Sequence, residues 1–286
     1  MQAKKLRELL NDKNIICAPG AYDAWSAKLI ADAGFPAVYM TGYGVSASVL
    51  GQPDIGLIGM SEMANAAGNI AHAAKIPLIA DADNGYGNTL NVIRTVQAYE
   101  RAGVAAIQIE DQVMPKRCGH MEGKELISQD DMVAKIRAAV YAKQCADTVI
   151  IARTDARAVH GFADAIARAQ AYVAAGADVI FFEAPASIEE MREVRRLLPV
   201  PLLANMVENG KTPLLSLQEL EQLGYNIAIF PASLLYAATK AVSELLGSLK
   251  TNGTTKMSLD NMVDFPTFNK MIGVQEYRDL EKSFSK

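Results

Sequence analysis

A cysteine surrounded by cations is the residue best suited to proton transfer in this chain. Cys118 follows Lys116 and Arg117, and Gly119 separates it from His120. Nearby positive charge stabilises a thiolate, so proton transfer near neutral pH becomes feasible for this thiol. The alternative interpretation is a solvated basic loop whose cysteine is merely exposed. The carboxylates upstream favour the chemical interpretation.

Three acidic residues upstream have the spacing of a cation site. Asp81 and Asp83 are two residues apart, so on an extended strand they face the same side, and Glu110 ends the next apolar run. An all-oxygen set with no thiolate or imidazole pair suits Mg²⁺ or Mn²⁺ better than Zn²⁺. Alternatively, Asp83 could cap the helix expected at 89–102. The sequence therefore predicts a magnesium site built on two strand ends.

The elements that must position these residues are short apolar runs alternating with alanine-rich segments of helical spacing. We expect strands at 15–18, 37–41, 77–83, 105–111, 148–155, 179–184, 201–206 and 227–231. We expect helices at 24–33, 61–74, 89–102, 130–145, 162–175, 187–197 and 217–223. This alternation, without a linker, is typical of a (β/α)8 TIM-type barrel.

An open doubly wound sheet is the competing architecture. It requires a glycine-rich fingerprint after the first strand, and Gly42-Tyr43-Gly44 lacks the third glycine. A barrel instead builds its site at the carboxyl ends of its strands. Polar residues stand at the ends of six expected strands, namely Thr41, Asp81, Asp83, Glu110, Arg153, Asp155, Glu183 and Asn205.

Arg153 and Glu183 have two interpretations. They could form a buried ion pair, or Arg153 could grip a substrate carboxylate with two parallel hydrogen bonds.

The end of the chain also has two interpretations. A helix at 233–249, a polar break at 251–255 and an amphipathic segment at 265–284 exceed what a barrel needs. The extension at 251–286 could cover the chain's own barrel or pack on a neighbouring subunit.

Composition limits the class of protein. The chain has 286 residues, 50% of them hydrophobic, and a net charge of -4. The length and hydrophobic content allow one α/β barrel or two ordinary domains, and because no composition shift marks a second domain we expect a single domain over residues 1–286. The charge argues against nucleic acid or membrane partners, so we expect a small-molecule substrate. Cys17 and Cys145 are expected to be small buried apolar residues. The N-terminus lacks a signal-peptide pattern, so we expect a cytoplasmic protein.

Two motifs, Asp81–Asn88 (DADNGYGN) and Lys116–His120 (KRCGH), give the chain a resemblance to the isocitrate lyase and phosphoenolpyruvate mutase superfamily over essentially its whole length. The resemblance implies an α/β barrel that forms a homo-oligomer, most often a tetramer. It implies Mg²⁺ held by Asp81 and Asp83, directly or through water, with Glu110 and Asp54 in the outer shell. The implied substrate is a 2-hydroxy acid whose C2–C3 bond is cleaved, leaving pyruvate or glyoxylate.

The resemblance also implies roles for individual residues. Cys118 would protonate C3 of an enediolate, which Lys116, His120 and Asn205 would stabilise, while Tyr39 and Arg153 are candidates for handling the hydroxyl proton. The residues expected to contact substrate are Thr41, Gly42, Tyr43, Gly119, Arg153, Glu183 and Asn205.

The Lys116–His120 loop and two further segments limit the choice of substrate. Phosphonomutases of the superfamily have a cysteine-free loop, so Lys116–His120 favours a carbon–carbon lyase. The 2-methylisocitrate lyases carry Ser-Gly-Gly at Thr41–Tyr43 and an arginine at Tyr236, which favours a dicarboxylate here. Residues 205–213 are similar to 2,3-dimethylmalate lyases, which form pyruvate and propionate. The alternatives are 2-methylisocitrate cleavage, oxaloacetate hydrolysis or decarboxylation, and a catalytically silent barrel that binds a metabolite.

Overall fold

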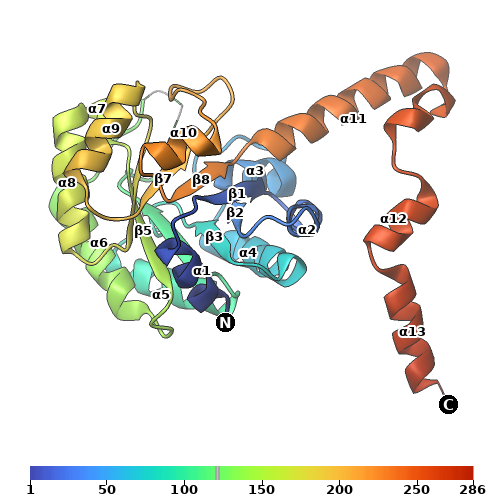
Figure 1. Cartoon of the computed structure of the whole chain (residues 1–286), viewed down its shortest axis with the longest axis horizontal. Helices are drawn as coiled ribbons and strands as arrows, with labels where there is room; N and C mark the ends of the chain where they lie inside the picture. The colour runs from blue at the N-terminus through green and yellow to red at the C-terminus, as the bar shows by residue number, and fades with distance from the viewer. Residues whose placement is uncertain (120, 122, 286) are drawn as a thin grey trace. The chain divides into compact units, whose positions relative to one another are not determined.

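The computed structural model contains eight parallel strands in one closed barrel (Figure 1), and it describes residues 1–119, 121 and 123–285. Each strand pairs with the next, and the pairing of Ile16 with Ile227 closes the ring. The strands are β1 (Ile16–Ala21), β2 (Val38–Met40), β3 (Leu78–Asp81), β4 (Ala106–Glu110), β5 (Val149–Thr154), β6 (Val179–Phe182), β7 (Leu202–Asn205) and β8 (Ile227–Phe230). The barrel prediction is confirmed, and the doubly wound alternative is wrong.

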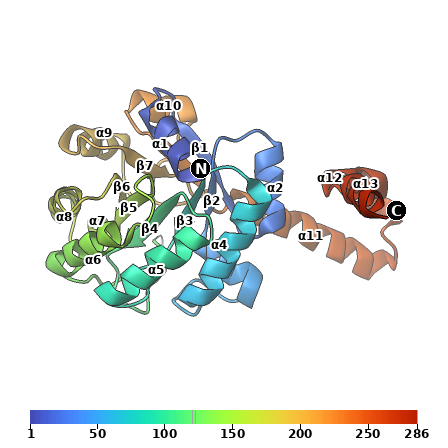
Figure 2. The same ribbon diagram turned by 90° about the horizontal axis from the view of Figure 1, so that it is seen from below.

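Helices surround the barrel, as the view from below shows (Figure 2). They are α1 (Gln2–Asn11), α2 (Ala24–Asp32), α3 (Gly42–Val45), α4 (Met60–Ala74), α5 (Thr89–Arg101), α6 (Gln129–Ala142), α7 (Ala156–Val159), α8 (Phe162–Ala174), α9 (Ile188–Leu197) and α10 (Leu217–Gln222), with a π-helical turn η1 (Ser46–Leu50). All seven helices expected between strands are present. The sequence interpretation missed α1, α3, η1 and α7, because short or terminal segments carry little periodicity.

Apolar side chains form two layers. The outer layer lies between the strands and the helices, whereas the inner layer fills the barrel with residues such as Ile79 and Phe181. Helix α1 adds Ala3 and Leu6 to the inner layer, and Leu6 is fully buried. A filled interior leaves the loops at the carboxyl ends of the strands as the place for a site.

The start of α5 resolves one alternative. Asn88 is its N-cap, and its Oδ1 accepts hydrogen bonds from the backbone N–H groups of Leu90 and Asn91 at 3.0 and 3.3 Å. Gly103, with a φ of 89°, follows the end of the helix in the left-handed conformation that glycine adopts readily. Asp83 therefore does not cap this helix, and its carboxylate lies elsewhere.

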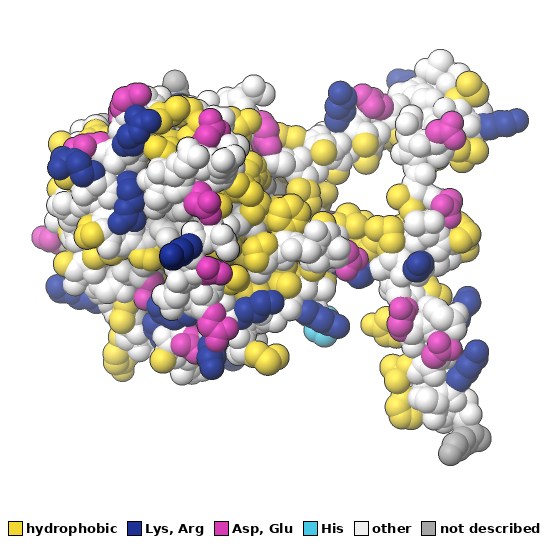
Figure 3. Space-filling model, viewed as in Figure 1, with side chains coloured by type: hydrophobic (Ala, Val, Ile, Leu, Met, Phe, Trp, Pro, Cys, Tyr) yellow, Lys and Arg dark blue, Asp and Glu magenta, His cyan; other side chains and the backbone are white. Residues whose placement is uncertain are grey.

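Contacts divide the chain into two compact units, Met1–Leu235 and Tyr236–Lys286. Helix α11 (Ser233–Asn252) begins in the first unit and continues into the second, which also holds the 3₁₀ helix η2 (Lys256–Asn261), α12 (Phe265–Met271) and α13 (Val274–Phe284). None of these four helices buries a described residue, and apolar side chains lie on their surface (Figure 3). No helix in the described part of the chain has the length and apolarity needed to cross a membrane.

A candidate active site at the barrel mouth

Lys116 lies among buried carboxylates. Its Nζ is 2.7 Å from Oδ1 of Asp54 and 2.7 Å from Oδ1 of Asp83, and all three side chains are almost completely buried. Burial disfavours the ammonium, but Asp83, Asp81, Glu110 and Asp54 together raise the pKa of Lys116 well above its ordinary value. Lys116 is therefore a cation at neutral pH, and it ties its loop to the end of β3 and to the segment after η1 that carries Asp54.

The strand-end acids are fixed by backbone and side-chain donors. Asp81 Oδ1 accepts the N–H of Asp83 at 3.0 Å and Nε2 of Gln108 at 3.3 Å. Gly42 approaches from α3, because a Cβ there would lie 2.7 Å from Oδ2 of Asp81. Burial raises the pKa of Asp83 to about 7, although Lys116 acts in the opposite direction. The Asp83 carboxylate thus lies where additional positive charge would stabilise it.

The acidic residues fit a hard divalent cation. Oδ2 of Asp83 and Oε1 of Glu110 are buried and accept no hydrogen bond from the residues described. Burial also raises the pKa of Glu110 well above its usual range, against the influence of Arg153. Within the described residues, no three His, Cys, Asp or Glu side chains form a ready-made metal cage. Mg²⁺ commonly uses one or two carboxylates together with water and substrate, so a full cage is not required.

Arg153, at the end of β5, is the second buried cation. Its Nε and Nη2 donate to Oδ2 and Oδ1 of Asp155 at 2.9 and 3.1 Å, and Nε lies 3.3 Å from Oε2 of Glu110. Glu183 is more distant, with Oε2 3.9 Å from Nε. The guanidinium also lies over the Phe181 ring at 4.9 Å. The main ionic partner of Arg153 is Asp155, where the sequence suggested Glu183.

The cysteine loop passes directly over this arginine. A Cβ on Gly119 would overlap Nη2 of Arg153 and the carboxylate of Glu183, so any larger residue would force these side chains to shift. Cys118, a partly buried cysteine, immediately precedes Gly119 at this contact. The sequence-predicted His120 lies outside the described residues. Cys118 is therefore held near Arg153 and Glu183 by the approach of its neighbour.

The remaining predicted residues also lie near the mouth. Tyr39 is buried, and its hydroxyl donates to Oε1 of Gln108 at 3.0 Å. Thr41 caps α3 by accepting the N–H of Gly44 at 3.3 Å, and the partly buried Tyr43 follows in that helix. Nδ2 of Asn205 lies 3.3 Å from Oε2 of Glu183.

The other two cysteines differ from each other. Cys17 is buried in β1, as expected. Cys145 is exposed, so its prediction was wrong: it follows the end of α6, where its backbone N–H donates to Glu100 at 3.1 Å.

Sequence reasoning missed Gln108, which is fully buried and bonds both Tyr39 and Asp81. A usable signal was present. Gln108 is the polar residue in the middle of an apolar strand, and its spacing of two from Glu110 puts both side chains on one face. Lys124 was also missed. Its Nζ donates to Asp155 at 2.9 Å and to the carbonyl of Gly119, and nothing in its loop sequence indicates this.

A family model described as phosphoenolpyruvate phosphomutase matches residues 6–250. A 2,3-dimethylmalate lyase from Eubacterium barkeri is 53% identical over 283 residues, covering 99% of this chain and 98% of the relative. A 2-methylisocitrate lyase from Aeropyrum pernix is 49% identical over 280 residues, covering 97% of this chain and 90% of the relative. The chain therefore belongs to the phosphoenolpyruvate mutase and isocitrate lyase superfamily, as its motifs indicated.

Solved structures agree with this membership. A crystal structure of 2,3-dimethylmalate lyase superposes with a TM-score of 0.94 at 43% identity, covering 99% of this chain and 95% of the other. An oxaloacetate acetylhydrolase in complex with 3,3-difluorooxalacetate also gives 0.94, at 40% identity, covering 99% and 96%. A phosphonopyruvate hydrolase in complex with oxalate and Mg²⁺ gives 0.90 at 30% identity, with both chains covered in full.

Proposed function

We propose that this chain is a Mg²⁺-dependent carbon–carbon lyase that cleaves 2,3-dimethylmalate to pyruvate and propionate. The observation that supports the proposal is the arrangement of the cysteine loop. Lys116 pairs with Asp54 and Asp83, and Gly119, the residue after Cys118, lies against Arg153. The 53% identity to a 2,3-dimethylmalate lyase over nearly the whole chain supports this substrate.

The proposed metal site uses the carboxylates at the ends of β3 and β4. Asp81 and Asp83 would hold Mg²⁺ directly or through water, with Glu110 and Asp54 in the outer shell; Mn²⁺ is a possible substitute. When bound, the cation would favour loss of the substrate hydroxyl proton by stabilising negative charge on that oxygen. Asp81→Ala should abolish Mg²⁺ binding in calorimetry and abolish turnover, while circular dichroism stays unchanged. Unchanged Mg²⁺ binding by the variant would remove Asp81 from the set.

The protein's own residues carry the other steps of the proposed mechanism. Arg153 grips a substrate carboxylate, and cleavage of the C2–C3 bond starts when a water molecule at the barrel mouth accepts the substrate hydroxyl proton. Burial raises the pKa of Tyr39 well above its ordinary value, so its phenol stays protonated and acts as a hydrogen-bond donor rather than a base. The electrons released from the broken bond form an enediolate on the propionate fragment. Lys116, His120 and Asn205 stabilise its negative charge.

Cys118 completes the proposed reaction by transferring its thiol proton to C3 of the enediolate. This gives propionate and leaves a thiolate, which the cations of the loop stabilise until solvent returns a proton. Thr41, Gly42, Tyr43, Gly119 and Glu183 are the proposed contacts that orient the substrate.

Oxaloacetate hydrolysis is the second candidate. It is favoured by one observation, the TM-score of 0.94 to an oxaloacetate acetylhydrolase, equal to that of the dimethylmalate lyase structure. In this reaction water adds to C2 and the C2–C3 bond breaks, so C3 of the departing acetate takes up a proton from water or from Cys118. Methylisocitrate cleavage is a third, supported by the 49% identity to a 2-methylisocitrate lyase.

A substrate panel separates these candidates. Product release is measured with dimethylmalate, methylisocitrate, isocitrate and oxaloacetate at equal concentrations, each with Mg²⁺ and with excess chelator. We expect the highest kcat/KM for dimethylmalate, with pyruvate formed, and no turnover in chelator. A higher kcat/KM for oxaloacetate, with oxalate and acetate formed, would replace the lyase proposal.

We further propose that the enzyme is a cytoplasmic homotetramer and that residues 251–286 form an extension of a single barrel domain. The helices of Tyr236–Lys286 expose apolar side chains at many positions, which is costly for an isolated chain in water. Examples are Leu246, Phe265, Tyr277 and Phe284.

A further inference from the structure

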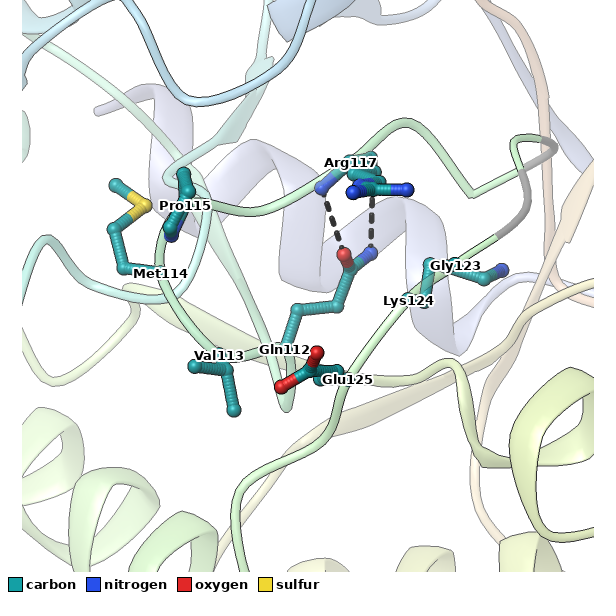
Figure 4. A pocket seen from close by; sticks show the side chains of 8 residues that line it. All are labelled: Gln112, Val113, Met114, Pro115, Arg117, Gly123, Lys124 and Glu125. Carbon is teal, nitrogen blue, oxygen red and sulfur yellow. Dashed lines mark hydrogen bonds between the residues drawn. The ribbon is translucent and has the colours of Figure 1, made fainter.

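Gln112 holds the backbone immediately before Cys118. Its side chain is buried at 1% exposure and exchanges two hydrogen bonds with Arg117, both drawn in Figure 4. The N–H of Arg117 donates to Oε1 at 2.9 Å, and Nε2 donates to the Arg117 carbonyl at 2.9 Å. The side-chain amide thus pairs with a peptide group in the way that a neighbouring strand would.

Lys124 holds the backbone immediately after Cys118. Its Nζ donates to the carbonyl of Gly119 and, at 2.9 Å, to Oδ1 of Asp155. The same Asp155 carboxylate accepts both hydrogen bonds from Arg153. A buried ammonium needs partners of this kind, because an unpaired charge inside a protein is strongly unfavourable. One carboxylate therefore connects the loop to the arginine proposed to grip substrate.

The two anchoring residues, Gln112 and Lys124, lie on or next to a short antiparallel stem formed by residues 111–113 and 125–127. The loop leaves β4 and returns beside itself, with the N–H of Val113 donating to Glu125 at 2.8 Å and the N–H of Ile127 donating to Asp111 at 3.0 Å. Gln112 pairs with Leu126 in the resulting antiparallel bridge. The stem fixes the backbone at Gln112 and beside Lys124, so the side-chain amide and the ammonium group have defined positions.

Asp111 fixes the other end of the Lys124 contact. Its carboxylate accepts the hydroxyls of Thr154 and Tyr172 at 2.7 and 2.8 Å and the backbone N–H of Asp155 at 2.9 Å. Asp155 is consequently held at both its backbone and its side chain. Hydrogen bonds therefore connect the stem, Lys124 and Asp155, which follows β5.

We propose that Gln112 and Lys124 are positioning residues that fix the Cys118 thiol relative to Arg153 and Glu183. The proposal rests on the proposed function, in which Cys118 is the proton donor. A proton donor must stay within hydrogen-bond reach of the atom it protonates, and a displacement of about 1 Å can reduce rate about 10²-fold. Hydrogen bonds to the residue before Cys118 and to the residue after it restrict the backbone that carries the thiol.

The test uses Gln112→Leu and Lys124→Met, which keep side-chain size and remove the hydrogen bonds. We expect each to lower kcat about 10–100-fold with KM changed less than about threefold, because substrate binding is retained while the donor is displaced. Gln170→Leu and Lys28→Met are matched controls, since each removes a comparable contact on an outer helix, and they should leave kcat unchanged.

A double-mutant cycle with Cys118→Ser shows whether the anchors act through the thiol. When Cys118→Ser is already present, Gln112→Leu and Lys124→Met should lower kcat further by less than about twofold. A change of that size lies within the usual deviation from additivity of independent substitutions. An equal loss in both backgrounds would overturn the positioning role and indicate a general structural effect. If Gln112→Leu does not fold by circular dichroism, Gln112→Asn, one methylene shorter, enters the same cycle.

Hydrogen exchange measured by mass spectrometry separates this proposal from the proposed function. The peptide containing the Arg117 amide should exchange faster in Gln112→Leu than in wild type. Unchanged exchange overturns the anchoring even where Cys118→Ser is inactive. Conversely, exchange could be faster in Gln112→Leu while Cys118→Ser keeps wild-type turnover. That result would leave the anchoring in place and overturn both the role of Cys118 as proton donor and the positioning role of its anchors.

Discussion

Buried cations at the barrel mouth are paired with carboxylates. Lys116 pairs with Asp54 and Asp83, and Arg153 pairs with Asp155. Asp155 also shows the balance: burial would raise its pKa, but Arg153 and Lys124 hold the pKa well below its usual range. Removing one partner from such a pair leaves an unpaired buried charge, which typically costs about 3–5 kcal/mol. The site can keep ionised groups out of water because almost none of them stands alone.

Cys118→Ser tests the proposed proton donor. Serine is similar in size but a much weaker acid, so KM should stay nearly constant while kcat falls by roughly 10²–10⁴-fold, the usual worth of general acid catalysis. Exchange of the C2 protons of propionate with solvent, at the carbon that was C3 of the substrate, should be lost in parallel when measured by NMR in the presence of pyruvate. The exposed Cys145 provides the control, because Cys145→Ser should keep both activities. Wild-type turnover in Cys118→Ser would exclude the thiol.

Cys17 should make the protein sensitive to alkali. Burial raises the pKa of its thiol from 9.0 to about 11. The unfolded thiol ionises first, so this contribution to stability is complete below pH 9 and is lost as the pH rises through 11. Allowing for partial solvent access, the contribution is about 1–2 kcal/mol.

Urea unfolding between pH 8 and 11 checks this. Cys17→Ala should lose less stability than wild type over that interval, while the exposed Cys145→Ala should follow wild type. Parallel curves for Cys17→Ala and wild type would contradict the prediction.

At the scale of elements, the sequence predicted what depends on local periodicity. All eight strands were located to within a few residues. The largest difference is in β1, which continues to Ala21 instead of ending at Ala18. Pro19 lies inside this strand and keeps its register with Phe230, since a proline removes only one donor from the ladder.

Contacts between segments far apart in the chain were harder to predict. Lys116 meets Asp54 across 62 positions and Lys124 meets Asp155 across 31. The sequence identified Lys116, Asp54 and Asp155 as polar site candidates, but their pairing depends on where the loops return. Lys124 and Gln112 gave no signal at all, because loop residues follow no period. Residue types at strand ends were therefore predictable, and their partners were not.

Helix α1 makes a prediction at this scale. Leu6 is fully buried in the barrel's inner layer, so Leu6→Ala should leave a cavity and lower the free energy of unfolding by about 2–5 kcal/mol. Leu90→Ala, at a position 71% exposed in α5, should change it by less than about 0.5 kcal/mol. Urea unfolding at pH 7 measures both. Equal small effects would mean that α1 contributes little to the barrel.

The whole molecule combines a net charge of -4 with a carboxyl-terminal unit that exposes apolar side chains. On the barrel, Lys and Arg side chains are interspersed with Asp and Glu on the face seen in Figure 3, so no single-sign patch dominates there. These features suit a small anionic substrate bound at a compensated site better than a polyanionic partner.

Sedimentation velocity tests the proposed tetramer. Wild type should sediment with about four times the mass of one chain, the expectation of the family resemblance. Replacing two exposed aromatic residues of the last helices, Phe265→Asp with Tyr277→Asp, should shift the distribution toward smaller species, since charge opposes burial at an interface. Val159→Asp, a similarly apolar exposed position on the barrel, serves as the comparison. A wild-type monomer at micromolar concentration would contradict the proposal.

The shared carboxylate of Asp155 has a thermodynamic consequence. Both of its oxygens accept hydrogen bonds from Arg153, and Oδ1 also accepts one from Lys124. A ligand that draws Arg153 toward its own carboxylate therefore leaves Asp155 more fully to Lys124. Ligand binding and loop order are then linked functions, and each changes the equilibrium of the other by the same factor. An anion that binds Arg153 should therefore slow hydrogen exchange in the loop. Conversely, ordering of the loop should tighten the binding of that anion, and the two effects should have the same factor.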